Sequence, residues 1–210
     1  MNGQIERRKR RRRWPLVLLM LLLLGALVWY FWPRPPQEIS AQALRDIPLL
    51  QQGDYYEPVA VFSGEPKSVA TSGCGAVCMA MSISYLTGQR VSPQDLFQWA
   101  CDNSFYFGYG LGHEALTAMA EQYQLTAQWI GNDQLGKVRA SLEKGYPVVA
   151  HMGPGTFTKG GHYILLRGVE GEEGVLVNDP QSVELSRTVH NIKDIQKELR
   201  REKSFLILKP

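Results

Sequence analysis

The sequence predicts an α+β domain in which N-terminal helices pack on a C-terminal antiparallel sheet, preceded by one transmembrane helix. Three observations indicate this arrangement. The N-terminus carries an uncharged apolar run, the next part has apolar side chains at helical spacing, and the last part has short apolar runs separated by turn residues. Helices and strands that are segregated along a chain in this way form α+β folds.

The apolar run covers residues 14–32 and contains no charged residue. As a helix with a rise of about 1.5 Å per residue, it would be roughly 28 Å long, close to the hydrocarbon core of a bilayer. Aromatic residues stand at both of its ends, and a block of consecutive cations, Arg7 to Arg13, precedes it. The pattern predicts a single-pass cell-membrane protein with segment 1–13 in the cytoplasm and residues 33–210 outside it.

A cleaved secretory signal peptide has the same layout of a basic and an apolar segment. The length of the run and its bulky aromatic end, in place of small residues at a cleavage site, favour a membrane anchor. Both interpretations place the rest of the chain outside the cytoplasm, and both exclude a cytosolic enzyme.

The formal net charge of +3 reflects the basic segment. Residues 1–13 hold seven of the 23 basic residues and one of the 20 acidic residues, so the remainder has 16 against 19, a net −3. Because surfaces that bind nucleic acid need an excess of cations, no nucleic-acid partner is predicted.

Residues 33–45 are predicted to be a linker, since the proline-rich stretch Pro33 to Gln37 cannot continue a helix. Residues 46–210 are long enough for one domain with its own core. Helices are predicted at 74–87, from Ser92 to about Ala100, from His113, from Asn132 and near 191–202. Strands are predicted at 147–152, 162–169, 174–179 and 204–209.

The chain contains three cysteines, Cys74, Cys78 and Cys101. In an exported protein a disulfide is the simplest expectation. Cys74 and Cys78 lie one helical turn apart, about 6 Å between Cβ atoms, which is too far for a disulfide without distortion. A bond between Cys78 and Cys101 remains open and would leave Cys74 free.

Cys74 has the surroundings of a nucleophile. It lies between Gly73 and Gly75 at the start of the first predicted helix of the domain, where free N–H groups and the helix dipole favour a thiolate. The flanking glycines carry no side chain that would block a substrate backbone. Cys78 lies one turn further inside, where a cysteine usually behaves as a small apolar residue.

A thiol nucleophile needs a base, and the base needs an orienting partner. His162 opens a predicted strand directly after two glycines, so its ring should stand at the rim of the sheet. The next predicted strand ends at Asp179, and antiparallel pairing can bring that carboxylate within hydrogen-bond reach of the imidazole. The other histidines, His113, His151 and His190, fit better as a cap, a core residue and a surface residue.

Two further segments flank these residues. Residues 153–161 contain four glycines and lead into His162, and they are predicted to form a hairpin loop, the alternative being a mobile lid. Residues 103–112 carry four aromatic residues among glycines. They either form one wall of a substrate groove or cover the core.

The segments GCGAVCMAMSISYL, GHYILLRGV and VNDP together resemble the extracytoplasmic relatives of the bacteriocin-processing, double-glycine-leader cysteine peptidases, which are papain-like. The resemblance covers most of residues 46–210. It implies that Cys74 is the nucleophile, His162 the general base and acid, and Asp179 the orienting residue.

The same resemblance implies a glutamine that donates to the oxyanion from an upstream Pro-x-x-x-Gln segment. Here Gln52 follows Pro48 by four residues, and its neighbour Gln51 is the alternative. In the transporter-fused members this glutamine stands much closer to the cysteine, and Ser68 occupies that place here.

The predicted function is that of a membrane-anchored cysteine peptidase that hydrolyses an extracytoplasmic peptide or protein through an acyl-enzyme. A cell-wall peptide amidase with the same thiol chemistry and a catalytically silent, peptide-binding papain-like domain are the alternatives. No cofactor is predicted. A zinc site of Cys74, Cys78 and His162 is disfavoured, because no second compact pair completes four ligands.

Overall fold

The computed structural model describes residues 14–31 and 40–210 of the chain. Two compact units are distinguished, residues 1–35 and residues 36–210. In the first unit the described residues form helix α1 (Trp14–Phe31). The predicted segment 1–13, Trp32 and the proline-rich part of the predicted linker lie outside the described residues.

Helix α1 confirms that the apolar run is helical. Its large apolar side chains between Val17 and Val28 are all exposed, so the helix has no core of its own to cover them. Within residues 14–31 and 40–210, no helix combines the length and the apolar character that a membrane span requires. Membrane insertion therefore stays a prediction.

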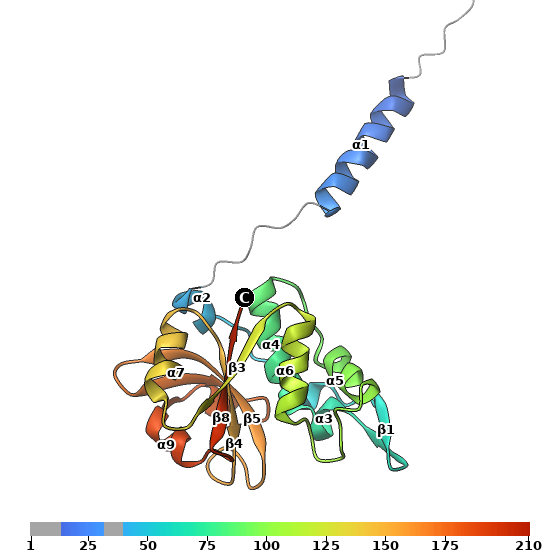
Figure 1. Ribbon diagram of the computed structural model, residues 1–210. Coiled ribbons are helices and arrows are strands. Elements are labelled where there is room, and N and C mark those ends of the chain that lie inside the picture. Colours follow the sequence, from blue (N-terminus) through green and yellow to red (C-terminus); the bar gives the residue numbers. More distant parts are fainter. Residues whose placement is uncertain (1–13, 32–39) are drawn as a thin grey trace, which may run out of the picture. The chain divides into compact units, whose positions relative to one another are not determined.

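The second unit begins with its helices (Figure 1). The first elements are α2 (Ala41–Arg45), η1 (Gln52–Asp54), the hairpin of β1 (Ala60–Phe62) and β2 (Glu65–Lys67), and α3 (Val69–Ser72). The larger helices are α4 (Cys74–Thr87), α5 (Pro93–Asp102) and α6 (His113–Gln122). Helix α2 lies ahead of the predicted domain start at residue 46 and belongs to the fold, since its Leu44 is fully buried.

The main sheet is six-stranded and antiparallel, in the order β3-β8-β4-β5-β6-β7. Its strands are β3 (Thr126–Gly131), β4 (Val148–Met152), β5 (His162–Glu170), β6 (Gly174–Asn178), β7 (Val189–Asn191) and β8 (Lys203–Lys209). Helices α7 (Leu135–Glu143), α8 (Val183–Ser186) and α9 (Ile192–Lys197) connect them. The predicted α+β arrangement of helices ahead of an antiparallel sheet is confirmed.

Helices cover both faces of the sheet. In Figure 1, α4 and α6 lie on one side of the strands and α7 on the other. Because both faces are covered, every residue of β4 is buried, which explains its continuous apolar sequence. Helix α4 packs on β5 and is almost entirely buried from Gly75 to Ile83.

Helix α4 has the predicted bounds, 74–87, and it ends at Gly88, whose φ of 68° is the left-handed conformation that glycine adopts easily. Ser92 caps α5 as predicted, since its hydroxyl accepts hydrogen bonds from two backbone N–H groups of the first turn. The N-terminal turn of α4 lies beside the start of β5, since the backbone at Gly75 packs against the ring of Tyr163.

Candidate active site

The nucleophile candidate stands at the positive end of α4. Cys74 is the first residue of the helix and is half-buried. The first helical hydrogen bond runs from the N–H of Val77 to the carbonyl of Gly73 at 3.0 Å, so the N–H groups before Val77 have no acceptor within the helix. These N–H groups, including that of Cys74, can bind negative charge at the thiol.

The two glycines beside Cys74 both lie in tightly packed surroundings. A Cβ at Gly73 would lie 2.6 Å from the Cα of Val69, because the chain turns sharply between α3 and α4. A Cβ at Gly75 would lie 3.1 Å from Leu116 and 3.2 Å from the ring of Tyr163. Gly73 therefore lies on the inner side of the turn, and Gly75 lets α4 pack closely against α6 and β5, whereas the sequence had suggested only access for a substrate.

The imidazole and the carboxylate form a buried pair. Nε2 of His162 lies 2.7 Å from Oδ1 of Asp179, and both side chains are 1% exposed. The other ring nitrogen, Nδ1, is buried and has no partner of standard hydrogen-bond geometry among the described residues, which leaves it available to the neighbouring thiol of Cys74. The sequence-predicted His162 and Asp179 are thus brought together.

The charge on this imidazole is set by opposing effects. Burial alone would lower the pKa of His162, but its hydrogen bonds with Asp179 and Cys74 and the charges of both groups raise the pKa to about 9. The Cys74 thiol therefore favours the protonated ring, as Asp179 does. A protonated His162 is therefore favoured at neutral pH.

Besides His162, three groups hold Asp179 in place. Its Oδ1 also accepts the backbone N–H of Gln181 at 2.8 Å. Its own N–H donates to the hydroxyl of Ser186 at 2.8 Å, and its carbonyl accepts the side-chain amide of Gln51 at 3.0 Å. No sequence pattern marks Ser186, because its role arises only where α8 folds back on the end of β6.

The two glutamines have different positions. Gln52 is 3% exposed, and its Nε2 donates to the carbonyl of Ala70 in α3 at 2.9 Å, four residues before Cys74. Its Oε1 accepts from the side chain of Gln181 at 3.3 Å. Because Gln51 donates instead to the carbonyl of Asp179, Gln52 is the glutamine whose amide reaches the segment that leads into Cys74.

The three cysteines are free, so the disulfide left open between Cys78 and Cys101 is absent. Cys78 is fully buried in the core, and its thiol donates to the carbonyl of Tyr163 at 3.4 Å. Burial raises the pKa of Cys78 well above its usual value, as expected of an inert core thiol. Within the described residues no group of three or more potential ligands is arranged to hold a metal.

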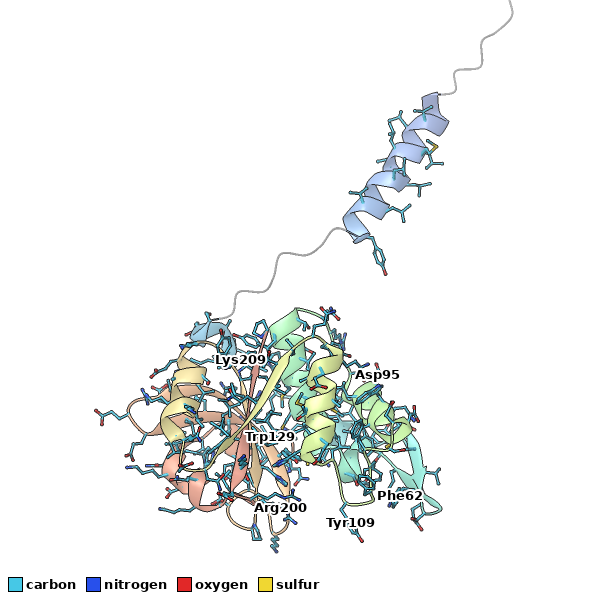
Figure 2. All side chains as sticks on the ribbon, in the orientation of Figure 1. Phe62, Asp95, Tyr109, Trp129, Arg200 and Lys209 are labelled. Carbon is cyan, nitrogen blue, oxygen red and sulfur yellow. The ribbon has the colours of Figure 1, made fainter. Side chains whose placement is uncertain are left out.

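The aromatic segment 103–112 both covers the core and presents exposed rings. Tyr106 is buried, packs edge-on against Phe97 and donates to the hydroxyl of Ser72 at 3.0 Å, which ties the segment to the turn before Cys74. Phe107 and Tyr109 are exposed. In Figure 2, Tyr109 and Arg200 lie along the same edge of the domain.

The remaining histidines take no part in this pair. The rings of His113 and His151 lie 3.1 Å apart at Nε2 and Nδ1, and His151 stacks on Tyr163. Burial and nearby positive charges lower the pKa of His151 to about 3, so its ring is neutral at ordinary pH. His190 is half-buried in β7, and its Nε2 donates to the carbonyl of Leu185 at 2.8 Å.

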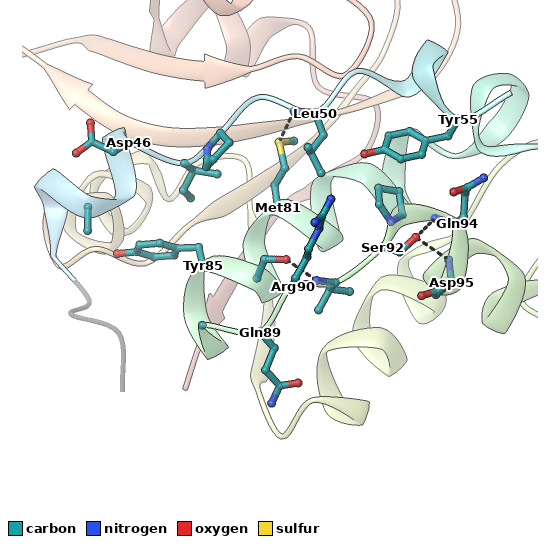
Figure 3. A pocket seen from close by; sticks show the side chains of 17 residues that line it. Asp46, Leu50, Tyr55, Met81, Tyr85, Gln89, Arg90, Ser92, Gln94 and Asp95 are labelled. Carbon is teal, nitrogen blue, oxygen red and sulfur yellow. Dashed lines mark hydrogen bonds between the residues drawn. The ribbon is translucent and has the colours of Figure 1, made fainter. Parts of the chain in front are cut away.

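A large cavity of about 790 Å³ lies elsewhere, around the C-terminal half of α4. Met81, Tyr85, Tyr55 and Arg90 are among its lining side chains (Figure 3). Neither Cys74 nor His162 nor Asp179 lines it, so cavity size does not mark the chemical site in this domain.

A half-buried thiol at a helix start and a buried imidazole–carboxylate pair at the rim of an antiparallel sheet define a papain-like cysteine peptidase domain. The model of the Peptidase_C39 like family matches residues 44–205, so this chain belongs to that family. The predicted family and the predicted enzyme class, a cysteine peptidase, are thereby confirmed.

Solved structures agree on the fold. A C39-like peptidase from Bacillus anthracis is 18% identical, with a TM-score of 0.56 over 79% of this chain and 94% of that chain. The peptidase domain of Streptococcus ComA, a bifunctional ABC transporter, is 18% identical, with a TM-score of 0.52 over 67% and 93%. A double-glycine motif protease from an AMS/PCAT transporter, in complex with its leader peptide, is 19% identical, with a TM-score of 0.50 over 83% and 97%. No curated protein matches this chain significantly.

Proposed function

We propose that this chain is a membrane-anchored cysteine peptidase that cleaves peptide bonds outside the cytoplasm, with Cys74 as nucleophile. The observation that carries the proposal is the buried hydrogen bond between Nε2 of His162 and Asp179, which leaves Nδ1 of the same ring available to the thiol of Cys74 at the start of α4. This is the constellation that thiol catalysis needs.

In the proposed reaction, the proton of the Cys74 thiol passes to His162 and gives a thiolate–imidazolium pair, which agrees with the raised pKa of the ring. The sulfur of this pair attacks the carbonyl carbon of the scissile bond. The C–N bond then breaks as the imidazolium of His162 gives its proton to the leaving amine. Water, deprotonated by His162, hydrolyses the thioester and releases the acid and the free thiol. Asp179 keeps the ring oriented and stabilises its positive charge.

The proposed oxyanion site combines the N–H of Cys74 with the side-chain amide of Gln52. The amide of Gln52 carries two hydrogens, of which the bond to Ala70 uses one. Removing one such donor costs about 10² to 10³-fold in kcat in well-studied enzymes. Gln51 is the weaker candidate, because its amide donates to the Asp179 carbonyl and not to the segment that precedes Cys74.

A peptide is the proposed substrate. The related double-glycine motif protease binds a leader peptide, and this chain presents exposed aromatic rings on the segment that is tied to the turn before Cys74. The cell membrane, with the domain on the extracytoplasmic side, is the proposed location. The exposed apolar side chains of α1 support the membrane location. The basic block Arg7 to Arg13 before the helix supports the orientation.

The test is covalent labelling with a peptide that carries a thiol-directed electrophile. The wild type should be labelled at one cysteine, Cys74→Ala should not be labelled, and Cys78→Ala should be labelled like the wild type, because Cys78 is buried. Site-resolved mass spectrometry measures the modified residue. Labelling of the Cys74→Ala protein equal to that of the wild type would refute the assignment.

Activity assays distinguish the remaining functions. Release of free amines from a peptide library, lost in Cys74→Ala, supports the peptidase. Release from purified cell wall but not from the library would indicate the amidase. Labelling of Cys74 without turnover of either substrate would indicate a silent binding domain.

A further inference from the structure

The loop between β4 and β5 connects directly to the proposed base. Residues 153–161 join Met152 to His162, which face each other in the antiparallel register of the two strands. The last residues of the loop, Gly160 and Gly161, are exposed and lie outside the strands. The position of the His162 backbone therefore depends on how this loop is held.

Glu198, at the end of α9, holds the first half of the loop. One carboxylate oxygen accepts the N–H of Thr156 at 2.8 Å, and the other accepts the hydroxyl of the same residue at 2.8 Å. The backbone of Glu198 also accepts the N–H of Gly153 at 2.6 Å. One residue thus fixes two positions of the loop, and hydrogen bonds to a charged acceptor are the stronger kind.

Arg200 holds the second half. Its N–H donates to the carbonyl of His151 at 2.9 Å, so the chain after α9 runs beside the end of β4. Its guanidinium donates to the carbonyl of Gly160 at 3.0 Å, two residues before His162. Phe157, between these two fixed points, is buried and packs near His190 with ring centroids 5.0 Å apart.

The glycine at 155 leaves room for the Glu198 carboxylate. A Cβ at Gly155 would lie 2.3 Å from the carboxyl carbon of Glu198 and 2.4 Å from its Oε2, so the carboxylate would have to leave its place. A Cβ at Gly160, in the same loop, would meet nothing within 4 Å. Neither glycine has a positive φ, so alanine fits the backbone at both positions.

We propose that Glu198 is a positioning residue for His162, acting through the loop 153–161, which it fixes at Thr156 and Gly153. The inference rests on the proposed function. The loop is neither a lid nor a passive connection: it transmits the position of the segment after α9 to the ring that exchanges protons with Cys74.

The test compares two alanine variants in the loop. Gly155→Ala should lower kcat on a fluorogenic peptide taken from the library by between about tenfold and a hundredfold, because small displacements of catalytic groups cost that much. KM should change by less than about twofold, since substrate contacts are untouched. Gly160→Ala is the matched control and should keep the wild-type kcat.

The carboxylate is tested by substitution and rescue. Glu198→Ala should lower kcat as Gly155→Ala does, and Glu198→Gln should restore part of it, because the amide oxygen can still accept one bond from Thr156. In the double variant, Gly155→Ala should add less than about a twofold effect to Glu198→Ala, since the carboxylate that it displaces is gone.

The alkylation rate of Cys74 at pH 7 provides a readout that needs no substrate, and it should fall in parallel with kcat. Wild-type kcat and alkylation rate in folded Gly155→Ala and Glu198→Ala proteins would overturn the inference, as would equal losses in Gly160→Ala. Those outcomes leave the proposed function intact as long as Cys74→Ala and His162→Ala are inactive. Activity in the latter two would instead refute the proposed function itself.

Discussion

At the scale of single residues, the chemistry depends on how the proton of His162 is held. Its pKa, raised to about 9, keeps the ring protonated below that pH, and the proton is lost as pH rises through it. Because the folded-state pKa lies above the usual 6.5, protonation also stabilises the fold. This stabilisation is complete below about pH 6.5 and disappears as pH rises through about 9.

Substitution of the orienting carboxylate tests this balance. Asp179→Asn should move the high-pH loss of kcat/KM from about 9 to a lower pH, because the hydrogen bond and charge that raise the pKa of His162 are weakened. It should also lower kcat by roughly 10²-fold. The measurement is the pH profile of kcat/KM for both proteins. An unchanged high-pH limb would show that Asp179 does not set the charge of the ring.

Sequence reasoning identified the residues whose chemistry is visible in their own neighbourhood. Cys74 follows from a thiol at a helix start, and His162 from an imidazole at a strand start. Ser186 and Glu198 could not be found in this way, because their contacts join parts of the chain that only the fold brings together. The same holds for Gly155, because the carboxylate of Glu198 occupies the place that a Cβ at position 155 would take.

At the scale of elements, the sharp turn between α3 and α4 positions the nucleophile. The chain passes so close to Val69 that only glycine fits at position 73. The sequence predicted α4 well, because a long apolar stripe and a glycine end are strong local signals. It missed the two edge strands of the main sheet, β3, whose first four residues are not buried, and β7, which has three residues. Both depend on pairing with their neighbours β8 and β6.

Two glycine substitutions test the turn. Gly73→Ala should lower the free energy of unfolding by about 1–3 kcal/mol, because its Cβ would overlap the backbone at Val69. Gly136→Ala, in α7, is the matched control: nothing lies within 4 Å of its Cβ, and alanine should stabilise the helix by about 0.5–1 kcal/mol. Urea denaturation measures both. Equal stability of Gly73→Ala and wild type would show that the turn relaxes freely.

At the scale of the whole molecule, the chain consists of a peptidase domain and an apolar helix in separate units. The sequence predicted the class of the domain from three short segments that carry its site. The domain start predicted from the sequence, residue 46, leaves α2 out of the domain. A five-residue helix with one buried leucine has too little apolar periodicity to be recognised in the sequence.

The proposed membrane anchor is tested by extraction. The full chain should stay with membranes in alkaline carbonate and be released by detergent. Replacing Leu21 and Leu24 together by arginine should release it into the carbonate supernatant, because each arginine costs about 3 kcal/mol near the bilayer centre. The control is replacement of both by isoleucine, which should remain in the pellet. Release of the unaltered chain by carbonate would contradict the anchor.

If Cys74 and His162 act as one unit, the rate at which iodoacetamide alkylates Cys74 at pH 7 depends on the imidazole. Peptide mass spectrometry resolves this rate from that of half-exposed Cys101, which serves as an internal reference. His162→Ala should slow alkylation of Cys74 by about tenfold or more and leave the rate at Cys101 unchanged. Equal rates at Cys74 in the folded variant and the wild type would show that the two residues do not act as one unit.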